Sequence, residues 1–499
     1  MPIVTINSNN GSEQFEFEAG QTLLQILQSR EKEIPAPCGG NGTCGKCRVN
    51  VKGMGYVTSC VYYPEDDLVV FVPNRGESKV LVNQHKYSLS LPLSPGGAFT
   101  LSDEPYGVAV DIGTTSIALY LICLKTGNVL GTRGKANSQS KYGADVISRI
   151  NHSAEDGVLS DLQHLVVDDI NELIDDVCSS FAVDSRNIVK LSVAANTTML
   201  HLLVAADPMP IALAPFTPEF IEERFIDNKD LGLQNLHAEC EVHLLPSISA
   251  YVGADIVSGL ASLKVPYGVN NYLFIDIGTN GEMALVTPEK IWCTATAAGP
   301  ALEGANISCG MGAYPGAISA YTADGFKTIN NEKVQGLCGS GLIDVVAHLL
   351  EKELIGMDGL LSENFVLATK EESGTGLEVA LTPQDIREVQ LAKSAIFTGI
   401  QTLMSVAAMD ENQIDALFLS GGLGNYLNID SAIKIGLLPS SLRKRIIQIG
   451  NSSGTGAVMD VRSTHFISIA KNIVANSQVI DLAADTNFEM NYAMNMFFM

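Results

Sequence analysis

The chain has 499 residues and a formal net charge of −24, from 31 Lys and Arg against 55 Asp and Glu. This acidic balance repels a nucleic-acid backbone, so we expect no nucleic-acid partner. No uninterrupted apolar run approaches the roughly 20 residues that a membrane-spanning helix needs, so we expect no membrane insertion. The N-terminal MPIVTINSNN has neither a basic start nor an apolar segment, which favours a cytoplasmic location.

Residues 1–75 are predicted to form a small β-rich domain. PIVTIN and EQFEFEA alternate apolar and polar residues as strands do, and GQTLLQILQSR has the spacing of a helix. CRVNVKG and DLVVFVP supply two further short β-rich runs. Between the helix and CRVNVKG lies the glycine-rich loop CGGNGTCGKC, whose glycines allow backbone N–H groups to approach a metal centre closely.

Four cysteines in this domain, Cys38, Cys44, Cys47 and Cys60, predict a metal site. Their spacing is one residue longer than the plant-type pattern for a [2Fe–2S] centre, and it resembles ferredoxins of the adrenodoxin type. Cys60 follows sooner than the fourth ligand of those proteins, which leaves no clear place for their intervening helix. Zinc is the alternative metal, although zinc ribbons usually bring paired CxxC motifs. The other six cysteines are scattered singly and are expected to be packing residues.

Residues 76–104 are predicted to be a linker, because Pro, Ser and Gly accumulate there and periodicity fades. A loop of this length is unusual inside a compact domain, so a domain boundary explains it better. The segment is either a tether for a mobile electron carrier or a passive spacer.

Two similar strand–turn–strand segments follow the linker. In YGVAVDIGTTSIALYLICL and NYLFIDIGTNGEMALVT an apolar strand ends at an aspartate, and Asp276 lies 165 residues after Asp111. The N–H groups and hydroxyls of such turns bind phosphate oxygens, and a strand-end aspartate addresses Mg²⁺ or an attacking water. We expect the two turns to bind one ATP with Mg²⁺. The predicted binding residues are Asp111, Gly113, Thr114, Thr115, Gly278, Thr279 and Asn280, and the candidate catalytic residues are Asp276, Glu282 and Asp111.

Two later glycine-rich turns complete the predicted cleft. In IDALFLSGGLGNYL a strand runs into Gly421 and Gly422, which open a helix and are expected on the adenosine side. CGSG supplies Gly339, Ser340 and Gly341 nearby, with an ordinary strand-to-helix turn as the alternative. There is no GxxxxGK[ST] loop.

This arrangement resembles the ASKHA superfamily of acetate and sugar kinases, Hsp70 and actin. The resemblance implies a multidomain α/β and α+β chain, with a β-grasp ferredoxin-like head and a duplicated ribonuclease-H-like ATPase domain. The expected divisions are a head at 1–75, a linker at 76–104, ATPase halves at 105–265 and 266–475, and a tail at 476–499.

Further strings are more specific, among them KYGADVISRIN, AANTTMLHLLVAADP, APFTP, AAGPALEGANISCGMGA and GLCGSGLIDVVAHLL. They resemble the reductive activators of corrinoid proteins. The resemblance implies ATP-dependent transfer of one electron from a [2Fe–2S] cluster to Co(II), which regenerates Co(I) in a corrinoid protein of a methyltransferase system. It also implies a low-potential electron donor, and it is compatible with a homodimer.

Two other functions stay open at this point. The chain is alternatively an ASKHA-type small-molecule kinase with a regulatory cluster, or an ATP-sensing redox binding module. The loop EGANISCGMGA is either a mobile segment that meets the corrinoid or a tight structural loop.

Overall fold

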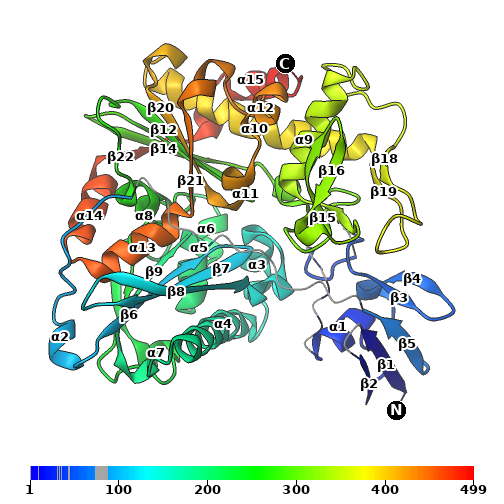
Figure 1. The fold of residues 1–499 in the computed structure, drawn as a ribbon, viewed down its shortest axis with the longest axis horizontal. Helices are drawn as coiled ribbons and strands as arrows, with labels where there is room; N and C mark the ends of the chain where they lie inside the picture. Colours follow the sequence, from blue (N-terminus) through cyan, green and yellow to red (C-terminus); the bar gives the residue numbers. More distant parts are fainter. Residues whose placement is uncertain are drawn as a thin grey trace.

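The computed structural model describes residues 2–8, 11–30, 32, 34, 36, 38–42, 45–72, 82 and 88–498. Figure 1 shows three bodies: a small N-terminal domain, and two larger α/β halves stacked above one another. The predicted ligand Cys44 lies outside the described residues. Within the described part of the chain, no helix has the length and apolar character needed to span a bilayer.

The N-terminal domain is a five-stranded sheet with one helix packed on it, in the order β2-β1-β5-β3-β4. The central pair β1–β5 is parallel, and the other pairs are antiparallel. This is the expected β-grasp head, and a β3–β4 hairpin precedes Cys60 in place of an intervening helix. The elements are β1 (Ile3–Ser8), β2 (Gly11–Glu16), α1 (Leu23–Gln28), β3 (Arg48–Val51), β4 (Gly55–Thr58) and β5 (Leu68–Phe71).

The first large half contains a six-stranded sheet in the order β10-β11-β9-β6-β7-β8. The long amphipathic helix α4 packs against β7 and β8 and buries its apolar face there. The strands of the first half are β6 (Tyr106–Ile112), β7 (Ser116–Cys123), β8 (Asn128–Ala136), β9 (Ile188–Ala195), β10 (Arg224–Asp227) and β11 (Glu241–Leu244). Its helices are α3 (Val146–Ser153), α4 (Val158–Phe181), α5 (Thr197–Leu203), α6 (Met209–Ala212), α7 (Asn228–Leu231) and α8 (Ala254–Ser262).

The second half also has a six-stranded sheet, in the order β21-β20-β12-β13-β14-β22. Its first five strands correspond to β11-β9-β6-β7-β8 of the first half, whereas the sixth strands, β10 and β22, lie at opposite edges. Its strands are β12 (Tyr272–Ile277), β13 (Gly281–Val286), β14 (Ile291–Thr296), β20 (Ala416–Ser420), β21 (Ile446–Gly450) and β22 (Ser477–Val479). Its helices are α9 (Gly339–Glu351), α10 (Pro383–Val406), α11 (Gly421–Tyr426), α12 (Ile429–Lys434), α13 (Ser452–Arg462), α14 (Phe466–Asn476) and α15 (Phe488–Asn495). Two small sheets, β15 (Ala317–Thr322), β16 (Gly325–Thr328) and β17 (Gly336–Leu337), and β18 (Phe365–Ala368) with β19 (Val379–Leu381), extend it.

The duplication is visible in the strand pairing. In each half the aspartate strand pairs antiparallel with the next strand and parallel with a later one, β6 with β7 and β9, and β12 with β13 and β20. Because these pairings are the same, Asp111 and Asp276 lie at equivalent ends of equivalent strands. The two halves are the ribonuclease-H-like units that the repeated aspartate turn predicts.

Helices α8 and α13 join the two halves. They pack against one another, and α13 also lies against β6 and β9 of the first half. The buried side chains of α13 and α14 belong to one hydrophobic core that also contains strand residues of both sheets, such as Val110 of β6 and Phe274 of β12.

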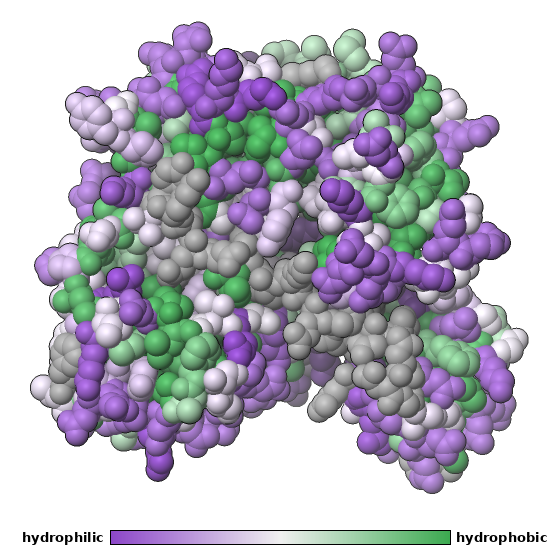
Figure 2. All heavy atoms as spheres, viewed as in Figure 1, coloured by the Kyte–Doolittle hydropathy of each residue, from purple (hydrophilic) through white to green (hydrophobic). Residues whose placement is uncertain are grey.

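The described part of the linker and the tail both pack on the ATPase halves. Ser88 and Ser94 form single bridges with Leu263 and Ser463, and α2 (Ala98–Leu101) precedes β6. At the other end of the chain, β22 extends the second sheet, α15 lies along α10, and the Phe498 side chain is buried. The hydrophilic residues that cover much of the visible surface in Figure 2 fit the strong net charge.

Candidate nucleotide and metal sites

A cleft of about 300 Å³ lies between the two halves, and both aspartate turns line it. Of the residues predicted to bind nucleotide, only Gly341 is not in its wall, because that residue packs against the Ile318 carbonyl. The predicted residues in the wall are Asp111, Gly113, Thr114, Thr115, Asp276, Gly278, Thr279, Asn280, Glu282, Gly339, Ser340, Gly421 and Gly422.

The first turn is held in shape by bonds from its own strand and from neighbouring segments. The Gly113 N–H donates to the Ser116 carbonyl at 2.9 Å, and the Asn137 amide donates to the Gly113 carbonyl at 2.9 Å. Below the turn, the buried Arg149 guanidinium donates to the Thr114 carbonyl at 2.5 Å. Burial lowers the pKa of Arg149 to about 10, so it stays positive at neutral pH and favours an anion at the turn.

The second turn meets the glycine-rich start of α11. The Gly278 N–H donates to the Asn280 carbonyl at 3.0 Å. Gly421 has φ +86°, and a Cβ there would lie 2.3 Å from Asp276 Oδ1. Only glycine fits this position, since another side chain would be strained in its backbone and would collide with the aspartate.

Asp111 is held by residues from the other half that sequence reasoning missed. The Asn451 amide donates to Oδ2 at 2.7 Å, and the Ser453 hydroxyl donates to Oδ1 at 2.7 Å. Both residues lie at the N-terminus of α13, in the string GNSSGTGA. A glycine-rich string that follows a strand and opens a helix was the available signal.

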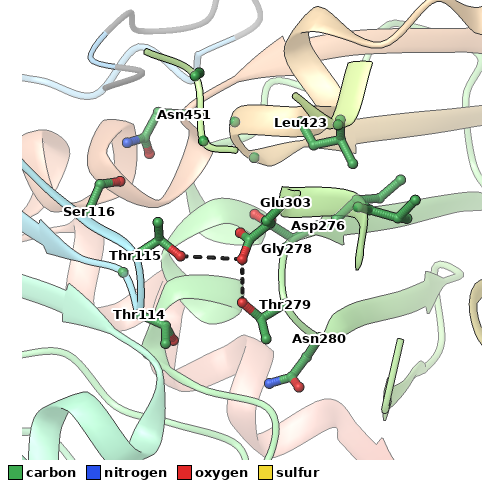
Figure 3. A pocket seen from close by; sticks show the side chains of 18 of the residues that line it. Thr114, Thr115, Ser116, Asp276, Gly278, Thr279, Asn280, Glu303, Leu423 and Asn451 are labelled. Atoms are coloured by element: carbon green, nitrogen blue, oxygen red, sulfur yellow. Dashed lines mark hydrogen bonds between the residues drawn. The ribbon is translucent and has the colours of Figure 1, made fainter. Parts of the chain in front are cut away.

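Glu303 connects the two turns and was also missed. Figure 3 shows its carboxylate between Thr115 and Thr279, whose hydroxyls donate to Glu303 Oε2 at 3.3 Å and 2.5 Å. It ends the short 3₁₀ helix Pro300–Glu303. The Glu303 carboxylate thus accepts hydrogen bonds from two hydroxyl groups that the sequence analysis predicts to bind phosphate.

The cleft concentrates acidic groups. Five carboxylates line it, namely Asp111, Asp255, Asp276, Glu282 and Glu303. Burial, strengthened by neighbouring carboxylates, raises the pKa of Asp276 to about 6 and that of Asp255 to about 7. Burial also raises the pKa values of the other three, that of Glu282 most strongly. Such groups ionise together only when a cation compensates their charge.

These carboxylates fit Mg²⁺ carried in with a nucleotide better than a protein-only metal site. Among the residues with a described placement, no three His, Cys, Asp or Glu side chains form a ready metal-binding group. Mg²⁺ usually takes one or two carboxylates and completes its octahedron with water and substrate phosphates. Asp111 and Asp276 are the candidates, because they end equivalent strands on the two sides of the cleft.

The described cysteines of the N-terminal loop come together. The Cys60 N–H points at Cys47 Sγ at 3.4 Å, both side chains are buried, and Cys38 is partly buried. Burial, followed by the nearby Cys47 sulfur, raises the pKa of the Cys60 thiol to about 11. Gly39, Gly40, Gly42 and Gly45 all have positive φ, which lets this loop wrap closely around a bound group. These features fit a thiolate-ligated cluster.

Three parts of the chain match known families. Residues 6–68 match the 2Fe-2S iron-sulfur cluster binding domain, residues 106–266 match the RACo middle region, and residues 270–499 match the C-terminal domain of RACo, the ASKHA domain. The first range contains all four loop cysteines, and the other two contain one aspartate turn each.

Relatives and a solved structure agree with these matches. Corrinoid activation enzyme RamQ of Eubacterium limosum is 32% identical over 419 residues, which cover 79% of this chain and 70% of the relative. The [Co(II) methylated amine-specific corrinoid protein] reductase of Methanosarcina barkeri is 27% identical over 409 residues, covering 74% of this chain and 73% of the relative. The solved structure of a reductive activator for corrinoid, iron-sulfur protein is 28% identical, with a TM-score of 0.74, and the similarity covers 100% of this chain and 98% of that one. This chain therefore belongs to the family of reductive activators of corrinoid proteins.

Proposed function

We propose that this chain uses ATP to drive one electron from its N-terminal [2Fe–2S] cluster onto the Co(II) centre of a corrinoid protein, which restores Co(I). One observation supports this proposal most directly. Strand-end aspartates from two duplicated halves line one cleft, and the same chain has a ferredoxin-like domain whose described cysteines converge. The names of its relatives supply the substrate class, since both refer to corrinoid activation or reduction.

In the cleft, the two turns bind the phosphates from opposite sides. The N–H groups and hydroxyls around Thr114, Thr115, Thr279 and Asn280 donate to phosphate oxygens, and Arg149 supports the first turn with its positive charge. Gly421 and Gly422 lie on the adenosine side, with Gly339 and Ser340 nearby. Gly341 has only a packing role, because it is outside the cleft wall.

The acidic residues divide the catalytic work. Asp111 and Asp276 are the proposed Mg²⁺ contacts, because each lies at the end of a strand that faces the phosphate turns. Glu282 has a strongly raised pKa and lies next to Asp276, so it is suited to orient or deprotonate the attacking water. We assign Asp276 to the same hydrolytic step, as the partner of Glu282.

In the head, Cys38, Cys44, Cys47 and Cys60 are the proposed ligands of the cluster. When bound, the cluster supplies one electron at a low potential. The protein shields Cys47 and Cys60 from solvent, and the positive φ angles of the loop glycines let the backbone pass close to the bound group.

ATP is needed because the electron moves uphill. A tenfold change in a one-electron equilibrium corresponds to about 59 mV, so a gap of roughly 300 mV requires about 7 kcal/mol. Nucleotide binding or hydrolysis supplies this only if it changes the complex with the corrinoid protein, because a ligand shifts an equilibrium by its differential affinity for the two states.

The remaining assignments are part of the same proposal. The domains are a head at 1–75, a linker at 76–104, two ATPase halves at 105–265 and 266–475, and a tail at 476–499. We propose a cytoplasmic protein that takes electrons from a low-potential donor and serves a methyltransferase system, with a homodimer as one assembly to test.

The test is ATP hydrolysis with and without a Co(II) corrinoid protein, under anaerobic conditions. The wild type should hydrolyse ATP slowly alone and faster with the corrinoid protein. Asp111→Asn should weaken binding of the Mg²⁺ nucleotide, and Asp276→Asn should mainly slow hydrolysis. Asp324→Asn, an exposed change on the β15–β16 turn, is the matched control. Equal hydrolysis in all four proteins would show that the cleft is wrongly assigned, and binding without turnover would leave only an ATP sensor.

A further inference from the structure

The cluster loop of the head is docked on the ATPase through Lys46. Its ammonium group donates to the carbonyls of Ile307, Ser308 and Gly310, the latter two at 3.3 Å and 3.4 Å. Lys46 directly precedes the predicted ligand Cys47. A second contact, from the Tyr56 hydroxyl to the Thr375 carbonyl at 2.7 Å, holds the β3–β4 hairpin. Figure 1 shows the head lying against the part of the second half that contains β15 to β19.

The segment that holds Lys46 begins in the nucleotide cleft. Glu303, bonded to Thr115 and Thr279, lies four residues before Ile307. Residues 303–310 therefore touch both phosphate turns at one end and the cluster loop at the other.

This segment is compact, and it is also bonded to the start of α10, because the Ser308 N–H and hydroxyl donate to Asp385 Oδ1 at 2.7 Å and 3.0 Å. The Gly310 N–H donates to the Ile307 carbonyl at 2.9 Å, and a Cβ on Gly310 would lie 2.0 Å from the Gly304 carbonyl oxygen. Gly304 itself has φ +84° and packs against the Met311 backbone. Because the loop is closed on itself, we expect a shift of Glu303 to reach the carbonyls around Lys46.

Helix α3 provides a second connection between a phosphate turn and the cluster loop. Arg149 on this helix donates to the Thr114 carbonyl of the first turn. One turn later, His152 lies against the cluster loop, because a Cβ on Gly39 would be 2.7 Å from its Nε2. The cluster loop thus rests on two elements, and each of them contacts a phosphate turn.

We propose that Glu303 occupies the position of a nucleotide phosphate, and that nucleotide binding displaces it and thereby releases the head from the carbonyl contacts of Lys46. The inference rests on the proposed function, because it requires ATP in this cleft. Each threonine hydroxyl has a single proton to donate, so the carboxylate and a phosphate compete for it. Two anions at one place also repel one another. The docked head and the bound nucleotide are therefore mutually unfavourable.

Linkage makes this proposal quantitative. If nucleotide weakens docking, then docking weakens nucleotide binding by the same factor. A change at Lys46, which lies outside the cleft wall, should consequently alter nucleotide affinity.

The experiment is hydrogen exchange on the full, cluster-loaded chain, with and without a non-hydrolysable ATP analogue and Mg²⁺. Nucleotide affinity is measured by calorimetry on the same samples. In the wild type, nucleotide should speed exchange at least threefold in peptides covering 45–60 and 304–311. Lys46→Gln should show this faster exchange without nucleotide and should bind the analogue several-fold more tightly. Glu303→Gln keeps acceptor oxygen and length but loses the charge, so it should also bind more tightly.

Lys52→Gln and Glu289→Gln, exposed changes in the head and on the second half, are the matched controls and should behave as the wild type. Cluster loading is checked by visible absorption in every variant. Tight nucleotide binding with unchanged exchange in both segments would overturn the inference and leave the proposed function intact. Unchanged affinity in Lys46→Gln, or weaker binding in Glu303→Gln, would also overturn it. No nucleotide binding by the wild type would reject the proposed function itself.

Discussion

At the scale of single residues, the nucleotide cleft is distinguished by the five carboxylates in its wall. Asp255 at the start of α8 lies near Asp276, much as Ser453 at the start of α13 lies beside Asp111. The two pairs are equivalent in the duplicated topology, but one pair is two carboxylates. Burial and mutual repulsion favour the protonated forms of Asp255 and Asp276 until a cation binds.

Burial of Asp255, together with its repulsion from Asp276, makes the stability of the nucleotide-free protein depend on pH. Burial and the nearby Asp276 carboxylate raise the pKa of Asp255 from its ordinary 3.8 to about 7, so the folded state holds this proton more tightly than the unfolded chain. The resulting stability is present below about pH 4 and is lost as pH rises through 7. Asp255→Asn keeps the acceptor for the Ile256 N–H and removes the charge. The variant should match the wild type near pH 4 and exceed it by on the order of 2–4 kcal/mol at pH 8.

The measurement is chemical unfolding of both proteins across this pH range without nucleotide or Mg²⁺. Asp103→Asn, on the exposed segment before β6, is the control and should show no such divergence. A constant difference between Asp255→Asn and the wild type at all pH values would refute the electrostatic explanation.

A second prediction at this scale concerns Gly421, the glycine that packs against Asp276. Gly421→Ala should destabilise the protein by about 1–3 kcal/mol, because the new methyl group meets Asp276 and the backbone is left-handed. Gly422→Ala is the matched control, since nothing lies within 4 Å of a Cβ there. Thermal unfolding of the nucleotide-free proteins compares them, and equal melting temperatures would mean that the turn relaxes freely.

The turn residues at this scale are predictable from the sequence, but their partners are not. Asp111, Asp276 and the threonines follow apolar strands, which is a local pattern. Glu303, Asn451 and Ser453 reach the cleft from distant segments, and Arg149 supports the first turn from behind, but no periodicity marks these residues. The string that contains Glu303 stands out in the sequence, but its role depends on where the chain returns in space.

At the scale of elements, the strongly periodic segments were predictable. The runs around PIVTIN, EQFEFEA and DLVVFVP form β1, β2 and β5, and ALFLS forms β20 followed by helix α11. The short strand β4 was not predicted. It is a four-residue edge strand that pairs only with β3 in the described sheet and has no fully buried residue, so no apolar alternation marks it. The linker and tail segments also gave little pattern, because their stability comes from contacts with α8, α13 and α10.

The tail offers a test of this tertiary contribution. Phe498 is 2% exposed, its ring lies 5.4 Å from Lys393 Nζ, and the same ammonium group donates to the Phe497 carbonyl. Phe498→Ala should therefore cost about 3 kcal/mol of unfolding free energy, from lost burial and the cavity left behind.

Met490→Ala is the control in the same helix region, because Met490 is 62% exposed, and it should change the unfolding free energy by less than about 0.5 kcal/mol. Urea unfolding of the full chain, followed by circular dichroism, gives both values. Similar small losses for the two variants would show that the tail does not stabilise the second half.

At the scale of the whole molecule, the duplication could be inferred from the repeated aspartate turn, but the connection between halves could not. Helices α13 and α14 follow a strand of the second sheet and lie in a hydrophobic core that both halves share. The N-terminus of α13 also brings Asn451 and Ser453 to Asp111, so a segment of the second half completes the surroundings of the first aspartate. The docking of the head through Lys46 likewise joins residues that lie 261 positions apart in the chain.

In the proposed mechanism, electron entry and ATP use are separate events that meet in one chain. The proposed cluster ligands all precede residue 61, and the nucleotide turns begin at Asp111. Asp276→Asn should therefore still take up an electron from dithionite at its cluster, but it should fail to generate Co(I) in the corrinoid protein. Cys47→Ala should retain ATP hydrolysis while passing no electrons, and a Cys47→Ala protein that does both would show that the cluster is not the route.

The most direct test of the central claim is the visible spectrum of a Co(II) corrinoid protein, followed anaerobically with reduced wild-type protein, first without and then with Mg²⁺ and ATP. We predict that the Co(I) spectrum appears only after ATP is added, because about 7 kcal/mol must be supplied to move the electron uphill. Formation of Co(I) at the same rate and to the same extent without nucleotide would contradict ATP-driven activation.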